Sequence, residues 1–233
     1  MKLIKNRRFG HEIKMAQIFH RGANNVAKAS IVIAIVLAAV AGYVFTQVSR
    51  SSYITQQFLE KQQPVQFSHK HHVGDDGIDC RYCHTAVETS YSAGIPPTQT
   101  CMNCHNQIWA DSPYLEPVRA SYRENKPIEW ERVHDLPEYA YFNHSIHIAK
   151  GVGCSTCHGQ IDNMPAVYQE SSLQMEWCLS CHREPEKYIR PKSEIYNMQW
   201  VDSDLSAEER TELKAEYKIR SEKMLTSCST CHR

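Results

Sequence analysis

The chain has 233 residues and balances 26 basic against 26 acidic side chains, so it has no net charge when its histidines are neutral. This balance excludes the strongly basic composition that nucleic-acid-binding proteins use, and we expect no nucleic-acid partner. The charges are nevertheless uneven. Residues 1–28 hold seven basic and one acidic side chain, a net +6, whereas the other 205 residues hold 19 and 25, a net −6.

Residues 29–48, ASIVIAIVLAAVAGYVFTQV, form a mostly apolar segment of twenty residues without a charge. A helix of that length measures about 30 Å, the thickness of a bilayer core. Because basic flanks stay in the cytoplasm, we expect residues 1–28 inside, a single anchor at 29–48 in the inner membrane, and 49–233 outside. The A-V-A sequence at 39–41 also resembles a signal-peptide cleavage site. The apolar run continues beyond it, which favours a retained anchor.

All ten cysteines fall in five copies of one motif, C-x-x-C-H, the attachment signature of c-type haem. Two thiols form thioethers with the haem vinyl groups, and the adjacent histidine becomes the proximal iron ligand. The spacing therefore predicts five covalent c haems. The motifs are Cys80/Cys83/His84, Cys101/Cys104/His105, Cys154/Cys157/His158, Cys178/Cys181/His182 and Cys228/Cys231/His232.

A zinc site, a redox pair and a disulfide framework each explain the cysteines less well. Zinc ribbons pair C-x-x-C knuckles without requiring a histidine after each. A redox C-x-x-C is usually single, and disulfide frameworks show no fixed C-x-x-C-H unit. Five haems in residues 49–233 leave about 37 residues per haem. We therefore expect the haems to form much of the core, with short helices and irregular chain, mostly α, wrapped around them.

The motifs belong to an internal duplication. Aligning Phe67 with Phe142 keeps the two halves in register with offsets of 74 to 77 residues. Each module reads F-x-H-x-x-H, then one C-x-x-C-H, then a second one 21 to 24 residues later. We place module 1 at about 64–110, module 2 at about 140–190 and the fifth haem at about 204–233. Before that haem, Ser206 and Glu209 predict a capping box that opens a helix over about 207–225.

The F-x-H-x-x-H histidines are candidate distal ligands, because a second histidine completes a low-spin, electron-transferring iron and residues three apart share a helix face. The duplication selects four of them: His69, His72, His144 and His147. His71 aligns with Ile146, so it is expected to be a surface residue.

The fifth haem lies outside the duplication, and its distal ligand has two candidates. One is His134, the remaining histidine in the extracytoplasmic part. The other is a methionine, with Met175 best placed by its position three residues before Cys178. Most methionines, however, are packing residues.

The F-x-H-x-x-H…C-x-x-C-H modules resemble class III multihaem cytochromes c. Over residues 64–233 the chain is also similar to the pentahaem membrane-anchored subunit of bacterial alternative complex III, a quinol:electron-acceptor oxidoreductase. The segments that carry this resemblance are FSHKHHVGDDGIDCRYCHTAVETSYSAGIPPTQTCMNCH, RVHDLPEYAYFNHSIH, CSTCHGQIDNMPAVYQ and LQMEWCLSCHREPE.

The resemblance implies an electron-carrier subunit without catalytic residues of its own. It also implies three kinds of partner: integral membrane quinol-binding subunits, a large iron–sulfur subunit and a monohaem cytochrome c. The final acceptor would be a periplasmic cytochrome c, a copper protein or a terminal oxidase. Two alternatives remain open: a free-standing membrane-anchored quinol dehydrogenase, and a catalytic multihaem reductase, which needs an iron with an open position.

Overall fold

A computed structural model of the protein describes residues 18–232, except for the side chain of Asp202. The described chain divides into two units, one ending at Ser49 and one beginning at Arg50. The expectation of a cytoplasmic segment at 1–28 falls largely on residues 1–17, which lie outside the described residues.

The first unit is dominated by α1 (Ala23–Arg50), a 28-residue helix with no buried residue. Its length corresponds to about 42 Å at 1.5 Å per residue, so it extends beyond the predicted segment 29–48 at both ends. Among the described residues it is the one helix long and apolar enough to cross a membrane, a property that signal sequences share.

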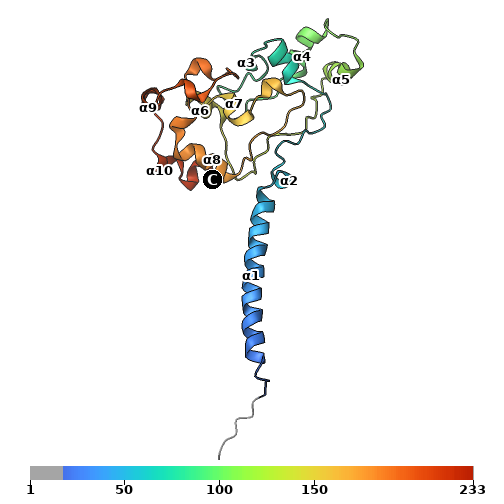
Figure 1. Ribbon diagram of the computed structural model, residues 1–233. Coiled ribbons are helices and arrows are strands. Elements are labelled where there is room, and N and C mark those ends of the chain that lie inside the picture. Colours follow the sequence, from blue (N-terminus) through green and yellow to red (C-terminus); the bar gives the residue numbers. More distant parts are fainter. Residues whose placement is uncertain (1–17, 233) are drawn as a thin grey trace, which may run out of the picture. The chain divides into compact units, whose positions relative to one another are not determined.

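The second unit is a chain of short helices joined by irregular segments, with no β-strand among its described residues (Figure 1). Isolated bridges join Gln57 to Gln169, Ala140 to His232 and Val152 to Ile189. This confirms the prediction of a mostly helical, irregular fold. The α-helices are α2 (Ser52–Thr55), α3 (Cys80–Cys83), α4 (Thr98–His105), α5 (Glu116–Glu124), α6 (His144–Ala149), α7 (Cys154–His158), α8 (Met175–Arg183), α9 (Ala207–Glu216), α10 (Glu222–Leu225) and α11 (Cys228–Cys231). The other helical turns are the π-helix η1 (Lys70–Asp75) and the 3₁₀ turns η2 (Pro113–Leu115), η3 (Ile161–Asn163), η4 (Pro185–Lys187), η5 (Lys192–Glu194) and η6 (Asp202–Asp204).

The two modules differ at one turn, and the sequence explains why. Eight positions separate His72 from Cys80, whereas seven separate His147 from Cys154. Module 1 absorbs its extra residue by forming the π-helix η1 where module 2 forms the α-helix α6. One-residue insertions of this kind are accommodated as π-turns, which are frequent at functional sites. The insertion thus lies after the two module histidines and leaves their three-residue spacing intact.

The segment before the last motif is interrupted. Ser206 and Glu209 form the predicted capping box at the start of α9. The predicted single helix over about 207–225 is wrong, however, because α9 ends at Glu216 and α10 begins at Glu222. Two features end α9. Lys218 adopts a left-handed φ of 49°, and the Lys150 ammonium donates to the Tyr217 carbonyl at 2.7 Å.

The apolar core made by protein atoms is thin. Eight hydrophobic side chains of the described residues are buried: Val65, Val87, Val118, Met164, Ile189, Ile195, Met198 and Tyr217. A globular unit of this length normally buries a much larger set. This paucity agrees with the expectation that the core of the unit is completed by its cofactors.

A buried arginine holds the start of α7. Arg190 is 3% exposed, and its guanidinium donates to the Ser155 hydroxyl at 3.2 Å and the Thr156 hydroxyl at 3.0 Å. A Cβ on Gly153 would collide with this guanidinium. A side chain before Cys154 would therefore displace the Arg190 guanidinium, and the two hydroxyl contacts tie module 2 to the chain that follows α8.

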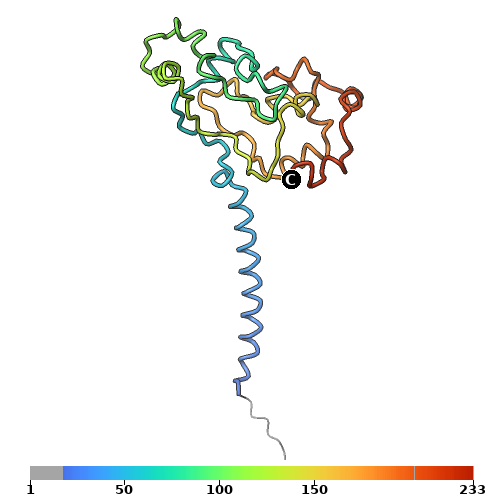
Figure 2. The backbone as a smooth tube through the Cα atoms, turned by 180° about the vertical axis from the view of Figure 1, so that it is seen from behind, coloured from blue at the N-terminus to red at the C-terminus, as the bar shows by residue number. Residues whose placement is uncertain are grey.

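The modules lie in order across the second unit. Figures 1 and 2, which view the molecule from opposite sides, both place α4 of module 1 and α5 of the connector that follows it at one end and α9 and α10 at the other. The backbone also links the modules, because the Tyr91 carbonyl accepts from the His144 N–H at 3.2 Å and the Ser90 carbonyl from the Ser145 N–H at 3.1 Å.

Candidate haem centres

The two cysteines of each motif lie on one helical turn. They begin and end the short helices α3 and α11, whose motif histidines follow the helix, whereas the other three motifs lie wholly within α4, α7 and α8. A helical turn brings residues i and i+3 to one face, so both cysteines of a motif face the same way. The Asp79 carboxylate caps α3 by accepting from the Arg81 N–H at 2.8 Å. None of the ten thiols is in a disulfide.

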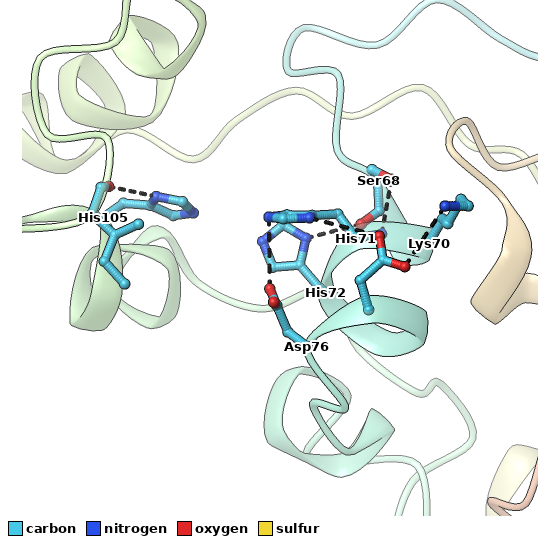
Figure 3. A network of polar contacts seen from close by, with 8 residues as sticks. Ser68, Lys70, His71, His72, Asp76 and His105 are labelled. Atoms are coloured by element: carbon cyan, nitrogen blue, oxygen red, sulfur yellow. Dashed lines mark hydrogen bonds and ion pairs between the residues drawn. The ribbon is translucent and has the colours of Figure 1, made fainter.

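The module histidines pair with the motif histidines in the same pattern in both modules. In module 1, the ring centres of His69 and His84 lie 6.4 Å apart and those of His72 and His105 6.1 Å apart. Figure 3 shows His72, on η1, and His105, at the end of α4, pointing toward one another.

Module 2 repeats these pairs: His144 and His158 are 6.4 Å apart, and His147 and His182 are 6.2 Å apart. The first histidine of each F-x-H-x-x-H therefore faces the first motif of its module, and the second histidine faces the second motif.

This separation can be compared with axial coordination. A metal–imidazole bond is about 2.0 Å long and the ring centre lies about 1.2 Å beyond the nitrogen, so two imidazoles on opposite sides of one iron have centres about 6.4 Å apart. The four observed separations fall at or just below that value. In contrast, no group of three or more His, Cys, Asp or Glu side chains in the described chain is arranged to hold a bare metal ion.

Hydrogen bonds fix which nitrogen of each ring is free. A carbonyl oxygen can only accept, so a ring whose Nδ1 meets a carbonyl carries its proton there and keeps its lone pair on Nε2. Metal-binding histidines are usually oriented in this way. Seven candidate ligands make such a bond: His84 to Gly94 (2.7 Å), His105 to Ile108 (2.9 Å), His182 to Leu225 (2.9 Å), His232 to Tyr139 (3.0 Å), His72 to Ser68 (2.9 Å), His147 to Asn143 (2.7 Å) and His144 to Tyr91 (3.0 Å). The residues present therefore fit c-type haem.

The phenylalanine of each module supports its two histidines. Phe67 meets the His69 ring edge-on, with centres 4.9 Å apart at 86°, and stacks on the His72 ring at 4.4 Å and 23°. Phe142 does the same with its own pair, at 4.7 Å and 89° and at 4.5 Å and 26°. This packing explains the phenylalanine of the F-x-H-x-x-H motif, for which the sequence alone suggests no role.

The five motif histidines and four module histidines make nine candidate ligands. Two of them, His69 and His158, have no backbone carbonyl as acceptor for Nδ1. The Nδ1 atom of His69 is buried and has no hydrogen-bond partner among the described residues. Burial, with His84 next, lowers the pKa of His69 to about 4. The Nδ1 atom of His158 lies 3.3 Å from Nε2 of His134, a side chain rather than a carbonyl. Burial, with His134 next, lowers the pKa of His158 to about 3. Both rings are therefore held neutral, as iron ligands must be.

The fifth motif has a different environment. Within the described chain no second histidine ring contacts that of His232, whose aromatic neighbour is Tyr139 at 5.9 Å. His134, expected as a distal ligand for this haem, lies instead against His158, with ring centres 4.4 Å apart. Met175, the other candidate, is 65% exposed at the start of α8.

His71 lies apart from the pairs. It is exposed, with its Nε2 3.6 Å from an Asp76 oxygen and its Nδ1 3.9 Å from an Asp75 oxygen, and it faces Trp109 with ring centres 6.3 Å apart. These contacts hold it at the surface beside two carboxylates, and Figure 3 shows its ring next to that of His72.

Contacts between motifs show how the attachment points follow one another. As free thiols, Cys80 and Cys154 lie within hydrogen-bonding reach; this contact lowers the pKa of Cys80 and raises that of Cys154. Burial raises the pKa of Cys83, and nearby Cys101, Cys80 and Cys104 raise it further. The first motifs of the two modules are therefore adjacent, and the motif of Cys101 lies beyond that of Cys83.

The same criterion extends the row through module 2. Burial raises the pKa of Cys157 to about 12, with contributions from Cys181 and Cys178. Burial also raises the pKa of Cys178, with a contribution from Cys231. The motifs that begin at Cys101, Cys80, Cys154, Cys178 and Cys228 therefore follow one another in this order across the unit.

Comparison with known proteins identifies the class. The family model described as cytochrome c7 and related cytochrome c matches residues 65–122 and 140–233, more than half of the chain. The two matched segments begin near the starts of the two modules. The chain belongs to this family and is a multihaem c-type cytochrome, an electron-transfer protein that carries covalently bound haem.

A curated relative is more specific. The chain is 28% identical over 146 residues to the menaquinone reductase, multiheme cytochrome c subunit, of Nitratidesulfovibrio vulgaris (strain Hildenborough). The match covers 54% of this chain and 70% of that protein. The resemblance to alternative complex III is more specific than what these two comparisons show.

Proposed function

We propose that this chain is the electron-transfer subunit of a membrane quinol:electron-acceptor oxidoreductase, with five c haems that connect a quinol site to an extracytoplasmic acceptor. Haem iron supplies one-electron redox chemistry when bound. The chain would attach each haem through two cysteines and supply imidazole ligands to the iron, and seven of these imidazoles are oriented by Nδ1 hydrogen bonds to backbone carbonyls.

One observation carries the proposal: the four histidine pairs. We assign His69 with His84, His72 with His105, His144 with His158, and His147 with His182 as axial ligands of four irons. An iron with two protein ligands has no position at which a substrate can bind, so these four centres suit electron transfer rather than catalysis. We therefore assign no catalytic residue to these four centres, and the multihaem reductase alternative would need an open position at the fifth iron, beside His232.

The row of motifs supports a relay. Each motif has a thiol close to a thiol of the next: Cys101 near Cys83, Cys80 near Cys154, Cys157 near Cys178, and Cys178 near Cys231. A continuous row allows electrons to enter at one end of the unit and leave at the other. The last motif is exposed at Cys228, which suits transfer to a partner at that end.

The partners follow from what a single helix lacks. Ligand sites in membrane bundles lie between facing helices, and α1 alone offers no facing helix for a quinol pocket. We propose that α1 anchors the chain with its basic N-terminal side in the cytoplasm and the haem unit in the periplasm. Integral quinol-binding subunits would supply the pocket, and a large iron–sulfur subunit and a monohaem cytochrome c would complete the assembly.

A second candidate concerns the direction of electron flow. The relative named above is a menaquinone reductase subunit, which favours a complex that passes electrons through the haems to a quinone. The same ligand set serves either direction, because the direction depends on the partners and on the haem potentials.

The test is purification of the full chain with its partners in mild detergent. We expect a complex in which a quinol analogue reduces the haems, and an isolated chain in which it does not. A comparable rate with the isolated chain would replace this proposal with the free-standing quinol dehydrogenase. If the haem-reduced complex instead reduces a quinone and the quinol leaves oxidised haems unchanged, the second candidate is correct.

A further inference from the structure

His158 differs from the other motif histidines in what its Nδ1 atom meets. At His84, His105, His182 and His232 the acceptor is a backbone carbonyl. At His158 it is Nε2 of His134, 3.3 Å away. Among the described motif histidines, His158 is therefore the one whose acceptor is a side chain, and it is the one whose acceptor a substitution can remove.

The chain after His158 explains why no carbonyl takes this place. In module 1, the segment after His84 turns back, and its Gly94 carbonyl reaches the histidine. In module 2, Gly159 turns the chain away with a φ of 64°. The following segment packs on η1 instead, where the Lys70 N–H donates to the Met164 carbonyl at 3.0 Å.

The connector between the modules supplies the missing acceptor. His134 is partly buried, and its ring meets the His158 ring at 74° with centres 4.4 Å apart. The connector itself is tied down nearby, because the Lys61 ammonium donates to the Arg132 carbonyl at 2.7 Å and Arg132 pairs with Asp135 at 2.9 Å.

We propose that His134 is a positioning residue for the haem attached at Cys154 and Cys157. It accepts the hydrogen bond from Nδ1 of His158, holds that ring toward the iron, and lowers the reduction potential of the centre. The inference rests on the proposed coordination of this iron by His158 and His144.

The chemistry leaves one arrangement of protons. His158 can bind iron through Nε2 only if its proton is on Nδ1, so Nε2 of His134 must be the acceptor. An acceptor at Nδ1 raises the basicity of a ligating imidazole. More electron density on the iron favours the oxidised state, which lowers the potential.

The same arrangement excludes His134 from a second task. Its Nε2 lone pair is directed at His158, and its own proton is then on Nδ1. A neutral histidine in this state has no lone pair left for another iron. In this position His134 is therefore not the distal ligand of the fifth haem.

The experiment compares His134→Leu and His134→Gln with the unaltered full chain loaded with haem. Leucine removes the acceptor, whereas the glutamine amide oxygen retains one. We expect both variants to keep their full haem content and their low-spin spectrum. In a redox titration, His134→Leu should raise the potential of one couple by about 59 mV, which corresponds to a tenfold change in a one-electron equilibrium. His134→Gln should restore most of this shift. His71→Leu, a change at an exposed histidine, is the matched control and should move no couple.

Three results would overturn the inference. A new high-spin iron in His134→Leu would show that His134 is an axial ligand. Unchanged potentials would show that the contact does not tune the haem. An equal shift in the leucine and glutamine variants would indicate loss of packing rather than of a hydrogen bond. His144→Ala tests the proposed coordination independently of His134. If this variant shows no high-spin iron, the coordination of this centre by His158 and His144 is itself incorrect.

Discussion

Adjacent histidines allow the proposed ligand set to be tested with a matched pair of variants, His72→Ala and His71→Ala. His72 faces His105 at 6.1 Å, the separation of two axial imidazoles, and its Nδ1 is held by the Ser68 carbonyl. Replacing it leaves both thioethers and the proximal ligand in place, so the haem should stay attached. The iron loses one of its two axial imidazoles.

The expected magnitude is one iron per chain. His71 cannot readily replace its neighbour, because its ring lies at 82° to that of His72 and its two nitrogens lie beside Asp75 and Asp76. His72→Ala should therefore convert about one fifth of the haem absorbance to a high-spin form. It should also bind one carbon monoxide per chain more than the unaltered protein in the reduced state. His71→Ala should change neither quantity.

The assay is optical spectroscopy of the haem-loaded chain, with carbon monoxide titrated to saturation and haem quantified in the same sample. A low-spin spectrum that survives loss of His72 but not of His71 would refute the pairing. It would show that the duplication misidentifies the ligand of module 1.

Further predictions concern haem attachment, the membrane anchor, the ligands of module 2 and the contact between Gly74 and Asp162. The intact mass should exceed that of the unmodified chain by five haems, with no free thiol detected; four haems or a disulfide would contradict the assignment of all ten cysteines. Residues 29–48 should remain in the mature protein, with the N-terminus accessible only from the cytoplasmic side, and a mature chain that begins near Gly42 would show that the anchor is cleaved. His147→Ala should open one iron, as its equivalent His72→Ala does, because the two modules have the same contacts; a spectrum without high-spin haem would separate the modules. Gly74→Ala should lower the free energy of unfolding of the haem unit by about 1–3 kcal/mol, because the new methyl group would collide with the Asp162 carbonyl. Thermal unfolding measures this, and an unchanged midpoint would show that the backbone at Asp162 moves aside without cost.

Much of the site was predictable because covalent haem attachment requires a fixed local motif. Cys80, Cys83 and His84 need only one helical turn, so the sequence alone specifies their relative placement. The selection of His69 and His72 came from comparing two copies of the same module, and their partners in the structure follow the same pattern in both copies.

Contacts between distant segments were not predictable in this way. The place of His134 depends on how the connector folds over module 2, and no local pattern records that His158 lacks a carbonyl acceptor. The break between α9 and α10 depends on a contact from Lys150, more than sixty residues earlier. The π-helix η1 was within reach of the sequence, since the single extra residue between His72 and Cys80 is visible in the alignment of the modules.

The most direct measurement of the central claim is a count of axial ligand types in the oxidised, haem-loaded chain by electron paramagnetic resonance and near-infrared magnetic circular dichroism. The four histidine pairs predict four low-spin irons with two histidine ligands each, none of which binds carbon monoxide when reduced. Fewer than four such irons, or an exogenous ligand bound at any of the four, would contradict the account of this chain as an electron relay.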